Sequence, residues 1–271
     1  MNQDQFPSIL KIITTNATEL LVFGLMMVLL QVIWPAYKKQ KQWDESSIID
    51  MMYSFMLAFM TPLFYALAIG LSNSLIQLVP GLGSIPGRFS ASWPFWLQVL
   101  AGIFLIDLVS YWRHRMMHSK WLWPIHAIHH SSVRLDWLST ERFHVFNYFV
   151  TTIINTLAVQ IFLGPEVALY GAILRRFYNF FIHANVNVSF GKLGYVFVSP
   201  RFHHWHHSAE PEAQDKNYCT FFSCIDWVFG TFYLPKEKAL PSEIGITVTV
   251  EENLWKQFLY PFRIWKGMLK K

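Results

Sequence analysis

Residues 51–71 read MMYSFMLAFMTPLFYALAIGL, a run of twenty-one residues without a charged side chain. About twenty apolar residues in helical conformation are enough to cross the hydrocarbon core of a bilayer. Pro62 lies inside the run and predicts a kink, because proline removes one backbone hydrogen bond from a helix. The stretch therefore indicates a membrane-spanning helix.

Three further apolar segments flank this run. Residues 20–36 (LLVFGLMMVLLQVIWPA) carry no charge, and residues 93–112 are interrupted only by Asp107. Residues 145–182 are broken in the middle by Gly164 and Pro165, which predicts a hairpin of two helices. Segment 80–86 (PGLGSIP) is expected to turn the chain. The pattern predicts an all-α protein with about four membrane spans or helical hairpins.

The composition agrees with a membrane protein. Charged residues make up 14% of the chain and hydrophobic residues 53%, whereas soluble domains carry about 25% charged residues. The net charge is +5, but the basic residues are dispersed and mostly flank apolar runs. A nucleic-acid-binding protein would concentrate them in one stripe, so this class is disfavoured. No linker or repeat marks a boundary, and residues 1–271 are expected to form a single membrane domain.

Basic residues in the loops predict the orientation. Lys38, Lys39 and Lys41 follow the first apolar run, and loops rich in lysine and arginine stay in the cytoplasm. Alternating the spans from this point places residues 113–142 and everything after residue 182 on the same side. All histidines are therefore expected on the cytoplasmic side, in a helical cap that carries them, in a bacterial inner membrane or the endoplasmic reticulum.

All eleven histidines lie between His114 and His207. They form an HxxxH cluster, two HxxHH-like clusters and isolated members. The set comprises His114 and His118; His126, His129 and His130; His144; His183; and His203, His204, His206 and His207. Clusters of this density are typical of metal sites, because imidazole is a ligand for iron, zinc and copper.

The spacing within the clusters predicts how the rings point. Residues i and i+4 share one face of a helix, so His114 and His118 can reach the same place. His126 shares a side with both His129 and His130, which are about 100° apart around the helix. One HxxHH cluster can thus serve two adjacent metal ions, and residues 203–207 repeat it. The number of histidines exceeds what one metal takes, which favours a dimetal centre.

Other polar residues have weaker signals. Asp107 shares a helical stripe with His114 and His118, so it is expected to accept a hydrogen bond from a ligating imidazole. The alternative for Asp107 is a polar anchor to a neighbouring helix or to the backbone. His204 is out of register with His206 and His207 and is not expected to bind metal. Cys219 and Cys224 are expected to be reduced thiols.

Residues 107–231 resemble the fatty acid hydroxylase/sterol desaturase superfamily of integral-membrane di-iron oxygenases. The motifs occur in the family's order: DLVSYWRHRMMH, HAIHHSS, RFH, HANVN, SPRFHHWHHS, NYC and DWVFGT. The resemblance implies nine metal ligands: His114, His118, His126, His129, His130, His183, His203, His206 and His207. It also implies two iron ions, which zinc can replace in a purified protein, and O₂ as co-substrate.

The sequence departs from the family pattern at several positions. Many members have a second histidine four residues after the one that corresponds to His183, and here that position is Asn187. Asn187, His144 or a water molecule is therefore expected to fill the place of a tenth ligand. Asn217 and Asp226 match the family's NYG and WDxxFGT motifs and are expected, with Asp107 and Asn187, to support the dimetal centre.

The function that the resemblance implies is O₂-dependent hydroxylation of a C–H bond in a lipid such as a fatty acyl chain, a sterol or an ether lipid. Desaturation on the same site is a close alternative. Electrons are expected from an external donor of the cytochrome b5, ferredoxin or reductase type, since no cytochrome domain accompanies the motifs. Two other classes remain open, a di-zinc membrane hydrolase and a metal-handling membrane protein.

Overall fold

A computed structural model describes residues 9–81, 92–162 and 165–270 of the chain. Its described elements are helical, and their only β features are two isolated bridges, Pro35 with Val186 and Ser208 with Ile244. The all-α prediction is confirmed for these residues. The helices are α1 (Ile9–Ile33), α2 (Glu45–Leu78), α3 (Phe95–Met117), α4 (Trp123–His130), η3 (Trp137–Glu141), α5 (Val145–Phe162), α6 (Pro165–His183), η4 (Gly191–Tyr195), α7 (Pro200–His206), η5 (Pro211–Ala213), α8 (Ser223–Val228) and α9 (Leu254–Met268).

Two of the described helices, α2 and α3, are long and apolar enough to cross a membrane. Within their most apolar windows only 33% and 39% of the residues are buried, so these helices are not the enclosed core of a soluble protein. Large apolar side chains instead face outward, such as Phe55 at 65% and Phe59 at 67% exposure. Exposed apolar surface on this scale marks a membrane-facing or partner-facing surface. The expected number of spans stays a prediction, since the apolar parts of α1 and α5 are shorter.

The ends of the long helices follow local chemistry. Asp44 caps α2: its carboxylate accepts the N–H of Ser47, whose hydroxyl in turn accepts the N–H of Asp44. Such a reciprocal box pairs backbone donors that the first helical turn leaves free. Pro62 lies inside α2, and Pro165 begins α6, where a missing N–H costs nothing. Gly164 and most of the 80–86 turn lie outside the described residues.

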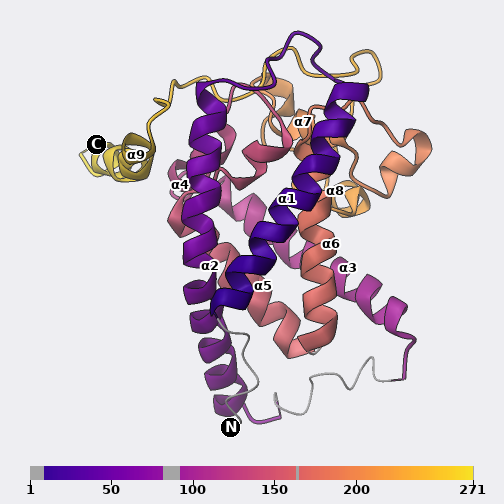
Figure 1. Cartoon of the computed structure of the whole chain (residues 1–271), viewed down its shortest axis with the longest axis vertical. Coiled ribbons are helices and arrows are strands. Elements are labelled where there is room, and N and C mark those ends of the chain that lie inside the picture. Colours follow the sequence, from indigo (N-terminus) through magenta and orange to yellow (C-terminus); the bar gives the residue numbers. More distant parts are fainter. Residues whose placement is uncertain (1–8, 82–91, 163–164, 271) are drawn as a thin grey trace.

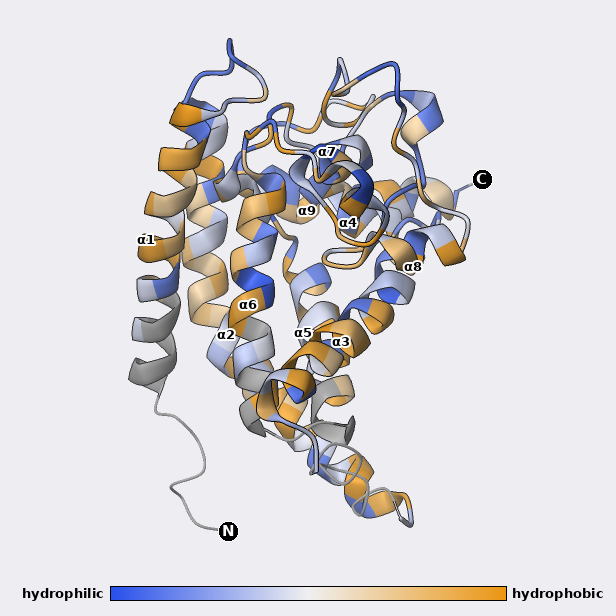
Figure 2. Ribbon diagram, turned by 90° about the vertical axis from the view of Figure 1, so that its right-hand side faces the viewer, coloured by the Kyte–Doolittle hydropathy of each residue, from blue (hydrophilic) through white to orange (hydrophobic). Residues whose placement is uncertain are grey.

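The long helices pack side by side and carry the short ones at one end (Figure 1). α2 packs against α5, while α3 packs against both α5 and α6. The short helices α4 and α7 lie at the upper end of this bundle, below the loop that joins α1 to α2. Figure 2 shows hydrophobic residues along the long helices and hydrophilic stretches in the loops above them. The lysine-rich loop and the histidine-bearing helices therefore share one end of the molecule.

A buried arginine joins the elements around this end. Arg142 is fully buried, and its guanidinium donates to the carboxylates of Asp50, at 2.5 Å, and Glu252, at 2.9 Å. It also donates to the carbonyl and hydroxyl oxygens of Ser46. The beginning of α2, the chain after η3 and the segment before α9 are thus held at one point, which fixes where α5 starts.

Candidate metal centre

Nine of the histidines reach the upper end of the bundle from four separate helices. His114 lies in the last turn of α3, which continues beyond the expected apolar span, and His118 is the residue that ends it. α4 carries the second cluster, α6 ends at His183, and α7 carries the last cluster up to His207. All of them are buried except His118, which is partly exposed.

The ring nitrogens of eight of these residues gather in two groups, and within each group they lie within 4.8 Å of one another. The larger group contains five histidines and the smaller three. Both groups contain only histidine among the described residues. They are His114, His118, His126, His130 and His206, and separately His129, His183 and His207.

The ninth histidine, His203, joins the smaller group. Its Nε2 lies 3.0 Å from Nε2 of His183 and 3.2 Å from Nε2 of His207. Each HxxHH-like cluster is consequently divided between the two groups: His126, for example, belongs to the larger group and His129 to the smaller one. The spacing predicted this division of the rings, while their role as ligands stays a prediction.

Hydrogen bonds at the outer nitrogens fix how several rings are protonated. Nδ1–H of His114 donates to the carbonyl of Tyr218 at 2.7 Å, and Nδ1–H of His206 donates to the carbonyl of Lys216 at 2.8 Å. His183 donates to the carbonyl of Asn179 at 2.8 Å. A neutral imidazole carries one proton, so Nε2 of each of these rings presents a lone pair to the centre of its group.

Burial keeps these rings neutral. It lowers the pKa of His126, His130 and His206 well below the usual range, and neighbouring histidines lower it further. His203 and His207 are depressed in pKa for the same two reasons. Neutral imidazole is the form that binds a metal ion, so the site is prepared for cations before any is bound.

The donor set fits a pair of transition-metal ions. Nε2 of His114, the unprotonated nitrogen of its ring, lies 2.9 Å from Nε2 of His126. Nε2 of His118 and Nε2 of His206 are buried and have no hydrogen-bond partner. Buried polar atoms without partners are costly in a native structure. A metal ion in the larger group would satisfy these two atoms, and Nε2 of His183 presents a lone pair to a second ion in the smaller group.

A short segment after η5 orients three of the rings. The Asp215 carboxylate accepts from Nδ1 of His118 at 3.2 Å, and the next carbonyl, that of Lys216, holds His206. The carbonyl of Tyr218 holds His114. Asp215 and Asn217 both have positive φ, at 57° and 60°, which asparagine and aspartate adopt more readily than other side chains. Sequence reasoning missed Asp215, because only the fold brings it beside His118.

Asn217 and Asp226, which the motifs singled out, hold this segment in place. The Asn217 side chain donates to the carbonyls of Phe202 and Tyr233 and accepts the N–H of Tyr233. The Asp226 carboxylate accepts the N–H groups of Tyr218 and Cys219. Both residues therefore act on the rings through the backbone between residues 216 and 219. Cys219 and Cys224 are free thiols.

The expected hydrogen bond from Asp107 to an imidazole is wrong. Asp107 is fully buried on α3, and its carboxylate accepts the backbone N–H groups of Thr220, Phe221 and Phe222 at 2.7–3.0 Å. The alternative, an anchor to the backbone, is what the structure contains. Three successive N–H groups outcompete a ring nitrogen because the loop after Tyr218 passes directly over the helix.

The residues proposed for a tenth ligand lie elsewhere. Asn187 is exposed, and its backbone N–H donates to the carbonyl of Trp34. His144 uses both nitrogens for structure: Nδ1 accepts the N–H of Phe146, and Nε2–H donates to the carbonyl of Phe258 at 3.1 Å. The structure thus places neither residue with the two groups.

His204 also lies apart from the metal centre, as its register predicts. Its Nε2–H donates to the carbonyl of Ala184 at 3.0 Å, and its ring stacks on Tyr37 at 5.8 Å between centroids. Asn147 is fully buried, and its amide nitrogen lies 3.3 Å from Nδ1 of His126. It is the side chain that faces the outer edge of that ring.

Comparisons with known proteins cover the same region. The model of the fatty acid hydroxylase family matches residues 99–231, which include all eleven histidines. No solved structure matches the chain.

Several curated proteins are similar to the chain. Ornithine lipid hydroxylase OlsE of Rhizobium tropici is 31% identical over 172 residues, which cover 63% of this chain and 52% of that protein. Alkylglycerol monooxygenase of Homo sapiens is 30% identical over 63% of this chain and 37% of its own length. Methylsterol monooxygenase 2-2 of Arabidopsis thaliana is 30% identical over 53% of this chain and 57% of its own. The chain thus spans about a third to a little over half of the length of these relatives.

Proposed function

We propose that this chain, whose residues 99–231 match the model of the fatty acid hydroxylase family, is a membrane-bound, O₂-dependent di-iron enzyme that hydroxylates a C–H bond of a lipid. The observation that carries the proposal is the convergence of nine neutral imidazoles into two adjacent groups without a carboxylate among the described residues. Each group offers lone pairs to one metal ion.

The residues divide between the two metals by their distances. His114, His118, His126, His130 and His206 would hold one iron ion. His129, His183, His203 and His207 would hold the other. When bound, such a pair activates O₂ for attack on an unreactive C–H bond. Imidazole ligands add no negative charge, so the pair would remain electrophilic.

The protein orients the histidine rings, keeps them neutral and excludes water from the centre. Asp215 and the carbonyls of Lys216 and Tyr218 hold Nδ1–H of three rings, which aims each Nε2 inward. Partners of this kind fix the tautomer and increase the basicity of a ligating histidine. Burial of nearly all the rings excludes water from the centre.

The membrane supplies the substrate in this proposal. The apolar outer surfaces of α2 and α3 support membrane association, and the relatives are named for ornithine lipids, alkylglycerols and methylsterols. Trp96, Trp112 and Trp121 are 67%, 50% and 54% exposed, as interfacial tryptophans are. We place the metal centre on the cytoplasmic side, with electrons delivered by a separate donor protein.

Hydrolysis by a pair of zinc ions is disfavoured by the surroundings of the rings. It requires a carboxylate base beside the metal, and the two glutamates that lie nearest the histidine clusters in the sequence are engaged elsewhere. Glu141 pairs with Arg176, and Glu210 pairs with Lys238. Metal transport is disfavoured because the histidines gather at one end of the helices instead of forming a path along them.

The test uses protein expressed with iron in cells whose lipids are compared with those of cells lacking the gene. We expect a hydroxylated lipid that contains oxygen from isotopically labelled O₂, and its loss in His129→Ala. The matched control is His204→Ala, which removes a buried histidine outside both groups and should retain the product. Zinc-dependent activity that persists without O₂ would overturn the proposal.

A further inference from the structure

The C-terminal helix α9 lies outside both the metal centre and the segment matched by the family model. It packs against α4 and α2. In Figure 1 it is seen end-on while α2 runs upright, so α9 crosses the direction of the long helix. Nε1–H of Trp265 donates to the carbonyl of Trp121 at 2.8 Å and ties α9 to the turn before α4. With α2 across a membrane, α9 runs along the membrane surface.

The outward face of α9 has an apolar edge. Trp255, Phe262 and Leu269 follow one another at seven-residue spacing and are 67%, 41% and 79% exposed. Residues i and i+7 lie on the same side of a helix, so these three form one continuous stripe. The opposite side of α9 carries the buried residues Gln257 and Pro261. The stripe therefore faces away from the protein.

A basic edge runs beside this stripe. Arg263, Lys266 and Lys270 are exposed, and no described residue forms an ion pair with any of them. Residues 254–270 contain no acidic side chain. Lys256 is the exception among the cations, because it pairs with Glu251. A helix with large apolar side chains on one edge and unpaired cations on the other is suited to the interface of an anionic membrane.

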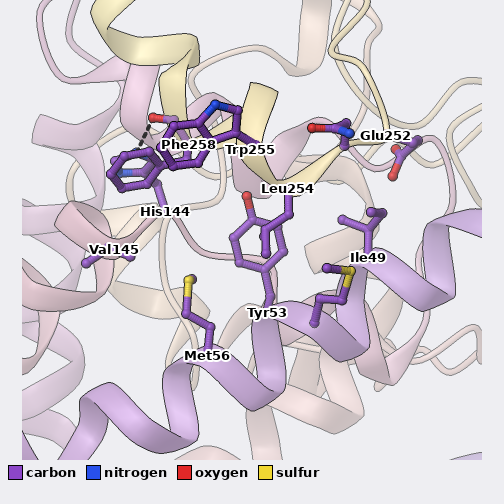
Figure 3. Close-up of a pocket in the computed structure, with 11 residues that line it drawn as sticks. Ile49, Tyr53, Met56, His144, Val145, Glu252, Leu254, Trp255 and Phe258 are labelled. Atoms are coloured by element: carbon purple, nitrogen blue, oxygen red, sulfur yellow. Dashed lines mark hydrogen bonds between the residues drawn. The ribbon is translucent and has the colours of Figure 1, made fainter.

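The level at which α9 crosses α2 agrees with a location at the membrane interface. A mostly apolar cleft of about 450 Å³ remains between the N-terminal third of α2 and the start of α9, with His144 and Val145 beside it (Figure 3). Its walls come from Ile49, Met52, Tyr53 and Met56 of α2 and from Leu254, Trp255 and Phe258 of α9. At this level the outer surface of α2 changes from its polar cap at Asp44 to exposed apolar residues such as Phe55. α9 thus lies where α2 would enter the hydrocarbon.

We propose that α9 is an interfacial helix that binds anionic phospholipid at the membrane surface. Trp255, Phe262 and Leu269 lie among the acyl chains, and the three unpaired cations face the acidic headgroups. Lipid hydrocarbon fills the cleft between α9 and α2. An acidic protein partner would form ion pairs with the cations but would leave the apolar walls of the cleft exposed to water. The inference rests on the membrane placement proposed above and not on the metal chemistry.

The test measures protection of α9 in the full-length protein. The protein is placed in nanodiscs of phosphatidylcholine alone, or of phosphatidylcholine and phosphatidylglycerol in equal parts, and trypsin cleavage after Arg263 is followed by mass spectrometry. Cleavage after the exposed Lys236, outside α9, corrects for any effect of the lipid on trypsin itself. We expect the corrected rate to fall about tenfold or more in the anionic discs, since clustered cations bind anionic lipid cooperatively with inserted apolar residues.

Variants separate the lipid from other partners. Lys266→Gln/Lys270→Gln keeps the Arg263 cleavage site and should lose most of the lipid-dependent protection. The matched control, Lys38→Gln/Lys39→Gln, removes the same charge from the loop before α2 and should retain it. Equal corrected rates in both lipids would overturn the proposal. So would protection that appears in lipid-free detergent and grows with protein concentration, which indicates a second copy of the chain. The readout needs neither iron nor turnover, so its outcome is independent of the proposed oxygenase activity.

Discussion

Removal of the Asp215 carboxylate should weaken one metal site while leaving the fold intact. The side chain of Asp215 is 71% exposed, and its one described contact with the metal centre is the hydrogen bond from Nδ1 of His118. Substitutions at exposed positions of this kind change stability by about 0.5 kcal/mol or less. Loss of a partner that orients a ligating histidine lowers metal affinity about 10–100-fold. Since each tenfold change is about 1.36 kcal/mol, the expected loss is about 1.4–2.7 kcal/mol.

The choice of substitution follows from the backbone. Asp215 has φ of +57°, which alanine adopts only with strain, whereas glycine and asparagine tolerate it. Asp215→Gly removes the carboxylate, and Asp215→Asn retains a neutral acceptor for His118. We therefore expect the glycine variant to show the full loss and the asparagine variant a smaller one.

The assay is competition for iron between the protein and a chelator, with the melting temperature of the metal-stripped protein as a check on folding. Glu212→Ala is the matched control, because it removes an exposed carboxylate from the neighbouring helix η5 without changing a contact to a histidine. If Asp215→Gly binds both metal ions as tightly as the unchanged protein, the hydrogen bond to His118 does not support the site and the reasoning fails.

Three other outcomes follow from the same structure. Arg142→Met should lower the free energy of unfolding, measured by chemical denaturation, by about 3–5 kcal/mol, because it leaves the buried Asp50 carboxylate without its partner. Lys256→Met breaks an exposed ion pair and should lower the free energy of unfolding much less. His203→Ala should lower the iron content of the purified protein, whereas His204→Ala should leave it unchanged, and equal losses would contradict the assignment of His203 to the smaller group. The metal-stripped protein should lose stability as the pH falls below about 6.5. Burial lowers the pKa of rings such as His207 in the folded chain, so the unfolded chain takes up more protons in this range. The free energy of unfolding should therefore fall by up to about 1.4 kcal/mol per pH unit for each ring. A melting temperature that stays constant from neutral pH to pH 5 would show that these rings are not buried in the neutral form.

The spacing of the histidines predicted the core of the site because the relevant geometry is local. His126 and His129 belong to one short helix, so the angle between them follows from the helical repeat alone. The same holds for His206 and His207, which the structure assigns to different groups as expected. His204 could be set aside on register for the same reason.

The supporting contacts could not be predicted because they join segments that are distant in sequence. Asp107 binds backbone N–H groups more than a hundred residues away, and a backbone donor has no signature in the sequence. The carbonyls of Lys216 and Tyr218 reach their rings only because Asn217 turns the chain at positive φ. His144 depends on where the C-terminal helix packs. The stripe of α9 did have a signal, the seven-residue spacing of Trp255 and Phe262, with basic residues between apolar ones.

The proposed function requires that the two histidine groups hold two iron ions. The most direct measurement is metal analysis of protein purified from iron-supplied cells, combined with Mössbauer spectroscopy of isotopically enriched samples. We expect two irons for each chain, both in nitrogen-rich surroundings and coupled to each other. One site should be lost selectively in His183→Ala, because that ring belongs to the smaller group. A single metal ion for each chain, or two zinc ions that support activity without O₂, would contradict it.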